Sequence, residues 1–161
     1  AAPTALVSDQ TVMTQLDAAV EAFVERMSRS ALTARGSERL AELLRIQRYY
    51  ATCASQALAA APLQLPSAAD AALMEHHQAF VAATQALLSA HDEPAPAGTA
   101  LDPQAMEARY QALKAAVLAA AASGMLPLAD METLLGRYSA LRRAVQQALK
   151  ARSRLHVQTA G

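Results

Sequence analysis

Apolar side chains recur at steps of three and four residues along most of the chain, which is the period of an amphipathic α-helix. The clearest case is residues 102–155, where the pattern predicts two long helices joined by one corner. Gly124 stands where a helix end favours a left-handed backbone conformation, and Pro127 where a first helical turn accepts proline. The predicted buried positions are Met106, Tyr110, Leu113, Val117 and Ala120, then Met131, Leu134, Leu135, Tyr138, Leu141, Val145 and Leu149.

The same period predicts a second helical hairpin over residues 9–61. We expect its first helix to start near Asp9 and to end before Gly36, and we expect Ser37 to cap its second helix. One short corner between two long helices makes them antiparallel neighbours. The predicted buried positions are Leu16, Val20, Phe23, Met27 and Ala31, then Leu40, Leu43, Leu44, Gln47, Ala51, Ala54 and Leu58.

A further helix is predicted between the hairpins, over residues 67–90, with Ser67 as its cap. Two proline-containing segments flank it. The first is 62–66, and the second is 91–101, which we interpret as a linker because its two prolines, glycine and two acids do not favour a helix. The inner positions of this helix are Leu73, His77, Phe80, Val81, Thr84, Leu87 and Leu88, and Asp102 with Pro103 then opens the next helix.

These elements predict an all-α fold in a single domain that covers residues 1–161. Hydrophobic residues make up 53% of the chain but aromatic residues only 4%, so alanine and leucine, which favour helices, carry the apolar content. Helices of about 25 residues, about 37 Å long, joined by short corners, form an elongated up-and-down antiparallel bundle of about five helices. The longest uncharged run, 49–69, is broken by Pro62 and Pro66, and we do not expect it to span a membrane.

The charge distribution limits the kinds of binding partner that we expect. The chain has 14 basic and 14 acidic residues and a net charge of zero, which argues against nucleic acid. The part from Arg137 onward has cations and no acid. It is either a solvated helix end, where cations suit the helix dipole, or a surface that meets anionic lipid or an acidic partner. The candidate contact residues are Arg142, Arg143, Lys150, Arg152 and Arg154.

Acidic side chains at steps of four residues are the candidate metal ligands. Asp17, Glu21 and Glu25 follow one another along the first helix, and Glu38 and Glu42 repeat the spacing on the second. Two such rows on antiparallel helices could bind a metal ion through oxygen ligands. The alternative is that Arg26, Arg29, Arg39 and Arg45 neutralise them in surface ion pairs.

Other reactive side chains point to no catalytic chemistry. His76 and His77 are adjacent, so their rings point about 100° apart on a helix and do not suit one shared metal ion. Cys53 is the single cysteine, and we expect it to be a small packing residue. There is no phosphate-binding glycine loop, nucleophile elbow or zinc-protease helix. We therefore expect no enzyme and no cofactor.

Two segments carry a resemblance to a known family. AFVERMSRSAL, followed by SERLAELLRIQRYYATCASQALA, resembles the start of a PhoU-like helical domain. Together with ALKAAVLAAAASGMLPLADMETLLGRYSALRRAVQQALKA, it is similar to the cytosolic C-terminal region of bacterial Na+/phosphate cotransporter family proteins. The resemblance spans roughly residues 16–155. It implies a soluble regulatory domain at the cytoplasmic face of the bacterial inner membrane, which modulates transport and does not carry substrate.

The resemblance also implies binding partners, and it shows one motif of the family that this sequence lacks. The partners are the transmembrane part of the same transporter and anionic lipid headgroups, and a homodimer is compatible with the sequence. PhoU-type domains carry Glu/Asp-x-x-x-Asp metal motifs, whereas no acidic pair here ends in Asp, so we expect no tightly held metal. The alternative functions are a free-standing helical adapter or ligand-binding bundle with no membrane link, and a metal-dependent enzyme in the bundle.

Overall fold

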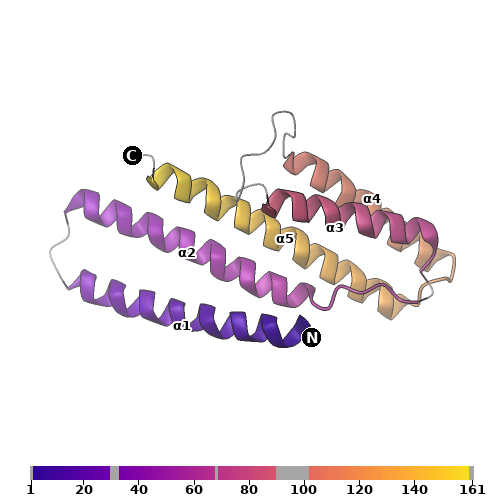
Figure 1. Ribbon diagram of the computed structural model, residues 1–161, viewed down its shortest axis with the longest axis horizontal. Coiled ribbons are helices and arrows are strands. Elements are labelled where there is room, and N and C mark those ends of the chain that lie inside the picture. The colour runs from indigo at the N-terminus through magenta and orange to yellow at the C-terminus, as the bar shows by residue number, and fades with distance from the viewer. Residues whose placement is uncertain (1, 30–32, 68, 90–101, 160–161) are drawn as a thin grey trace.

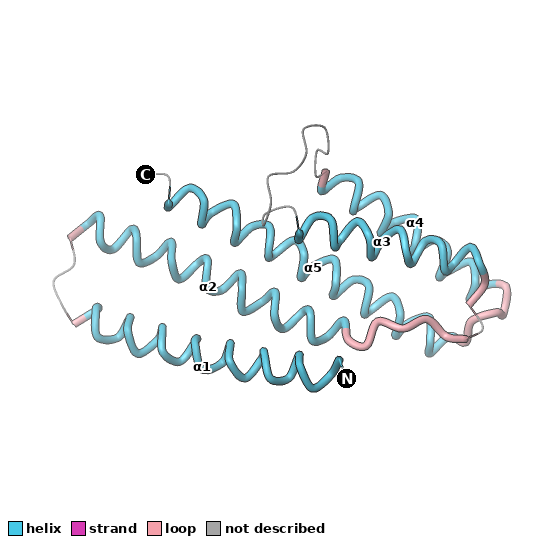
Figure 2. Tube along the Cα trace, in the orientation of Figure 1, coloured by secondary structure: helices cyan, strands magenta, loops and turns pink. Residues whose placement is uncertain are grey.

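The computed structural model describes residues 2–29, 33–67, 69–89 and 102–159, and only the backbone of residues 2–10, 28 and 157–159. Five α-helices occupy most of these residues, and the described ranges contain no strand (Figure 2). The helices are α1 (Ala2–Ser28), α2 (Ala34–Ala60), α3 (Ala71–Ser89), α4 (Pro103–Ala122) and α5 (Leu128–Thr159). The predicted all-α helical bundle is confirmed.

The longest helix, α5, contacts every helix except α1 (Figure 1). α2 runs antiparallel to α5 and makes the most extensive packing in the molecule with it. The pair α3 and α4 packs against α5, with hydrogen bonds that run from Tyr138 to Arg152. α1 lies along the edge of the molecule, where α2 is the only helix among the described elements that packs against it.

The main core lies between α3, α4 and α5. Its buried residues are Leu73, Phe80, Leu87, Met106, Tyr110, Leu113, Val117, Ala120, Leu126, Leu134, Tyr138 and Val145. Phe80 is central, because its ring centroid lies 5.8 Å from that of Tyr110 and 6.0 Å from that of Tyr138. Tilted and edge-on ring pairs at this separation are favourable. The five buried positions predicted for α4 are all correct.

The interface between α2 and α5 uses smaller side chains. α5 buries four alanines at steps of four and three residues, Ala140, Ala144, Ala148 and Ala151. The backbone of Ala148 lies within hydrogen-bond reach of the Cys53 thiol, which places this row of alanines against α2. A row of methyl groups allows two helix axes to approach closely along their length.

The corner between α4 and α5 has the predicted glycine. Gly124 has a φ angle of 77°, its N–H donates to the Ala121 carbonyl over 3.0 Å, and the Met125 N–H donates to the Ala120 carbonyl over 3.0 Å. This pair of bonds is a Schellman motif, which satisfies carbonyls that the end of α4 leaves free. Asp102 caps α4, as predicted, by accepting from the Gln104 N–H over 2.8 Å.

Several predicted helix boundaries differ from the observed ones. The first helix starts at Ala2 and ends at Ser28, and Gly36 does not separate it from α2 because Gly36 lies in the first turn of α2. Thr33 is the cap in place of Ser37, because its backbone is extended and its hydroxyl accepts from the Gly36 N–H over 3.1 Å.

For α3 the cap is Asp70 and not Ser67. The Asp70 carboxylate accepts from the Leu73 N–H over 2.7 Å, and a carboxylate at this place satisfies a first-turn donor that has no partner within the helix. Residues 61–67, 69 and 70 are not helical, which agrees with the predicted break at 62–66. The predicted linker 91–101 lies outside the described residues. α5 continues four residues beyond the predicted end at 155.

Substitutions at two glycines, Gly124 and Gly136, test whether the left-handed backbone conformation at Gly124 requires glycine. We expect Gly124→Ala to lower the free energy of unfolding by about 1–2 kcal/mol, because a Cβ disfavours a left-handed conformation. Gly136→Ala is the matched control: it lies within α5 with open space around the site of a Cβ, and we expect it to raise stability by up to about 1 kcal/mol. Urea denaturation measures both, and equal changes in the two variants would contradict the assignment.

Candidate functional site

An apolar groove runs between α1 and α2. Its volume is about 380 Å³, and its lining residues are Met13, Leu16, Asp17, Val20, Phe23, Val24, Leu40, Leu43, Leu44, Ile46, Gln47 and Tyr50. Of its polar lining groups, two bind each other, because the Gln47 amide donates to the Asp17 carboxylate over 2.6 Å. This bond ties α1 to α2 and leaves the rest of the groove almost wholly hydrophobic.

Several side chains predicted to be buried lie exposed beside this groove. Leu16 is 53% exposed, Phe23 48% and Leu43 51%, and Val12 nearby on α1 is 59% exposed. The apolar stripe of α1 is broad, and one neighbouring helix does not cover a stripe of that width. The prediction that Leu16, Phe23 and Leu43 are core residues is therefore wrong. Leu58 in α2 was also predicted to be buried, and it is 37% exposed.

The candidate metal ligands do not gather at one place. Asp17 is bound to Gln47, and Glu25 forms an ion pair with Arg29. Glu21 and Glu38 are exposed. Within the described residues, no group of three histidine, cysteine, aspartate or glutamate side chains is placed to bind a metal ion.

Glu42 belongs to a charged cluster that joins α2 to α5. Its carboxylate accepts from Arg154 over 2.7 Å and from Arg45 over 2.9 Å. The hydrogen bond from Arg154 lowers the pKa of Glu42, and both arginines add to the effect as nearby cations. The Arg154 guanidinium also lies 5.9 Å from the centroid of the Tyr49 ring, within range of a cation–π contact.

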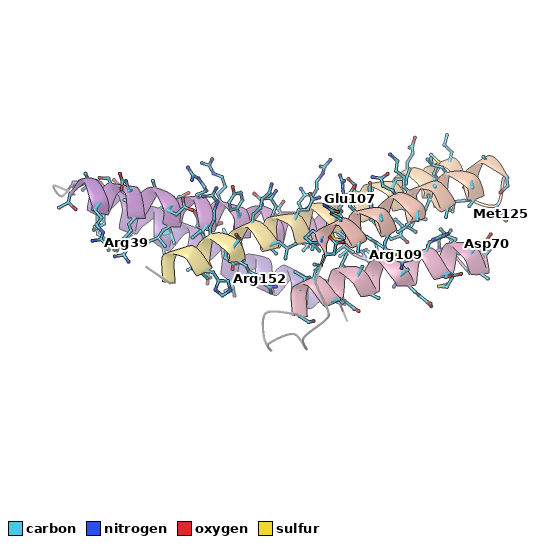
Figure 3. All side chains as sticks on the ribbon, turned by 90° about the horizontal axis from the view of Figure 1, so that it is seen from above. Arg39, Asp70, Glu107, Arg109, Met125 and Arg152 are labelled. Atoms are coloured by element: carbon cyan, nitrogen blue, oxygen red, sulfur yellow. The ribbon has the colours of Figure 1, made fainter. Side chains whose placement is uncertain are left out.

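Three of the five predicted contact cations bind groups within the fold. Arg154 pairs with Glu42. Arg142 donates to both oxygens of Glu107 on α4, over 2.9 and 3.2 Å, and stacks 4.5 Å from the Tyr110 ring centroid. Arg152 donates over 2.6 Å to the carbonyl of Leu88 in the last turn of α3, far along α5 from the Glu107 contact (Figure 3).

The remaining two cations, Arg143 and Lys150, are exposed on α5. Lys150 lines a second, open groove of about 850 Å³, together with Glu42, Tyr49, Pro103, Gln146, Leu149, Ser153 and Arg154. The sequence did not reveal the roles of Arg152 and Arg154, because their partners lie 64 and 112 residues away along the chain. No local spacing signals such a contact.

A polar pair of one buried and one half-buried side chain, Tyr138 and His77, lies beside the aromatic core. The Tyr138 hydroxyl lies 2.8 Å from Nδ1 of His77, and Tyr138 is only 1% exposed. Burial lowers the pKa of His77 from its ordinary value of 6.5 and raises the pKa of Tyr138 to about 12. A neutral imidazole accepts the phenol proton at Nδ1, whereas an imidazolium has no free acceptor. The pair thus stays neutral at physiological pH.

Cys53 is partly buried between α2 and α5, in agreement with a packing role. Desolvation by burial raises the pKa of the thiol, although the nearby Arg152 acts in the opposite direction. A raised pKa disfavours the nucleophilic thiolate.

No protein-family model, curated protein or solved structure matches this chain. In the described part of the chain, none of the helices is both long and apolar enough to cross a lipid bilayer.

The His77–Tyr138 pair predicts a pH dependence of stability. Below pH 6.5 the unfolded chain protonates His77 before the folded chain does, so stability falls as the pH decreases toward the lowered pKa. We expect His77→Gln to flatten the fall in the free energy of unfolding between neutral pH and about pH 5, and urea denaturation at each pH measures it. His76→Gln is the matched control. An unchanged slope in His77→Gln would contradict the role of the pair.

Proposed function

We propose that this chain is a non-catalytic interaction module that binds a helical element of a partner on the groove between α1 and α2. The observation that carries the proposal is the exposed apolar lip of that groove, formed by Leu16, Phe23 and Leu43. Large apolar side chains that gather on one face of a folded chain mark interaction sites.

The form of the groove favours a helical partner. It lies between two antiparallel helices, and its lining offers almost no free polar group, since Asp17 and Gln47 bind each other. An irregular segment would leave backbone N–H and C=O groups without partners there, whereas a helix satisfies its own. An amphipathic helix presents apolar side chains at steps of three and four residues, which suits a groove of this kind.

Binding of a model helix tests this proposal. The probe is a fluorescein-labelled amphipathic peptide of leucine and lysine, followed by fluorescence anisotropy. We expect Leu16→Glu and Leu43→Glu each to weaken binding about tenfold or more, because a charge would be placed in the apolar contact. Leu128→Glu is the matched control, since Leu128 is 66% exposed and lies outside the groove, and it should bind as the wild type does.

Equal weakening in Leu128→Glu would show that the peptide binds exposed leucines without preference for the groove, and would overturn the proposal. Circular dichroism checks that each variant keeps its helices. All three substitutions replace exposed side chains, so we expect the fold to persist.

The sequence resemblance favours one version of this interaction module. In that version the chain is a regulatory domain of a sodium-dependent phosphate transporter. The partner would then be the transmembrane part of the same protein, with anionic lipid nearby at the cytoplasmic face of the membrane. The exposure of Arg143 and Lys150 on α5 supports a contact with headgroups. A free-standing adapter that uses the same groove is the alternative.

The lipid contact is expected to be weak. Arg142, Arg152 and Arg154 are engaged within the fold, which leaves two cations worth about 1 kcal/mol each near an anionic bilayer. We expect slight, salt-sensitive binding to vesicles that contain phosphatidylserine, measured by co-sedimentation. The double substitution Arg143→Ala and Lys150→Ala should abolish it.

The matched control for that experiment removes two exposed charges from α4, Arg109→Ala with Lys114→Ala. Binding that is equal on neutral and anionic vesicles, or that the α4 control lowers to the same extent, would remove the lipid contact from the proposal.

A further inference from the structure

We infer that α1 is a detachable helix, which opens away from α2 as a unit while α2, α3, α4 and α5 stay packed on one another. Half of the residues that line the α1–α2 groove belong to α1, so the groove exists only while α1 is docked. Opening of α1 therefore regulates this site. That regulatory consequence rests on the proposed function, whereas the opening itself does not.

The described side chains of α1 bury little surface. Among residues 11–27 none is buried, and the half-buried ones are Met13, Asp17, Val20, Val24 and Met27. The shorter helix α4, by contrast, buries five side chains. Burial of apolar area is the main favourable term in folding, so this segment of α1 gains little of it by docking.

The packing between α1 and α2 is also open. The groove of about 380 Å³ is apolar space that the side chains of neither helix fill. Protein interiors leave few voids larger than a water molecule, and atoms that line an unfilled space lose contacts on one side. The other side of α2 differs, because α5 presents a row of buried alanines to it. The looser of the two contacts of α2 is thus the one with α1.

Polar contacts hold α2 to α5 independently of α1. The Arg154 guanidinium binds Glu42 over 2.7 Å and lies 5.9 Å from the centroid of the Tyr49 ring. Toward α1, one hydrogen bond crosses, from the Gln47 amide to the Asp17 carboxylate. Since α2 is the only described helix that packs against α1, α1 can leave without breaking any contact among the other four.

An opened α1 is expected to lose its helical hydrogen bonds part of the time, because isolated helices are only marginally stable in water. Its backbone amides then exchange with solvent during each opening, whereas amides in the main core wait for a larger unfolding event. Hydrogen exchange therefore reports the opening directly.

Hydrogen exchange of the full chain, followed by NMR at increasing concentrations of urea below the unfolding transition, tests the inference. We expect the amides of residues 11–27 to share one protection factor, at least about 100-fold lower than that of residues 105–120 in α4. The exchange of α1 should depend little on urea and that of α4 strongly, because opening one helix exposes less surface than global unfolding does.

Two substitutions that leave the sequence of α1 unchanged test the bond between the helices. Gln47→Ala should raise the exchange rates in α1 about tenfold and leave those in α4 unchanged, because it removes the donor to Asp17. Arg48→Ala is the matched control, since Arg48 is the neighbouring residue on α2, is exposed and does not line the groove. It should exchange as the wild type does.

A third substitution tests the open packing in the opposite direction. Val20→Leu adds one methylene group inside the groove, where space is open. We expect it to slow the exchange of α1 about fourfold, because the added group is buried only while α1 is docked.

Three results would overturn the inference. The first is an α1 that exchanges with the same protection and the same urea dependence as α4, because α1 would then open only with the whole molecule. The second is a complete lack of protection over residues 11–27, because α1 would then not dock. The third is an equal rise in exchange for Gln47→Ala and Arg48→Ala.

The inference and the proposed function can fail separately. The amphipathic peptide of leucine and lysine should slow the exchange of α1 when it occupies the groove, because it binds the docked form. A chain that binds the peptide but opens α1 only by global unfolding keeps the proposed function and rejects the inference. A chain whose α1 opens alone but that binds no peptide supports the opening and rejects the proposed function.

Discussion

The fold depends on the simultaneous burial of two sides of α5. One side presents large residues, with Tyr138 and Val145, to α3 and α4, and the other presents a row of alanines to α2. Burial of apolar area is the main favourable term in folding, and here one helix supplies it to both halves of the molecule. Without α5, α2 would keep only its limited packing with α1.

The polar contacts of α5 fix the register of its neighbours. Arg142 reaches Glu107 on α4, Arg152 reaches the Leu88 carbonyl at the end of α3, and Arg154 reaches Glu42 on α2. Large apolar surfaces are nearly non-directional and tolerate small shifts along a helix axis, whereas hydrogen bonds from a guanidinium require a defined position. The cations that gave the C-terminal part its basic character thus serve largely to set how the helices align.

How well the sequence predicted the structure depends on how many neighbours each helix has. The period of apolar residues predicted the buried face of α4 correctly, because α4 packs on both α3 and α5 and little of its stripe stays uncovered. The same reasoning failed for Leu16 and Leu43, because a periodic pattern shows which face is apolar and does not show whether anything covers it. The predicted cap was wrong where two nearby polar residues could each cap the same helix, as Thr33 and Ser37 could for α2, since the side chain of either can accept a first-turn N–H. The groove could not be predicted, because it exists only where α1 has no second neighbour among the described helices.

The position of α5 in the chain has a consequence for biosynthesis. Three of the hydrogen bonds between α5 and the other helices join residues 61, 64 and 112 positions apart, and in each of them the later residue belongs to α5. A ribosome releases the chain from its N-terminal end, so the earlier helices emerge before the one that unites them. Until residues 128–159 have left the exit tunnel, only local pairs such as α1 with α2 and α3 with α4 have a partner to pack on. The faces of α2, α3 and α4 that pack on α5 therefore stay without that partner until it emerges, and the packing of the five helices is completed by the one that emerges last.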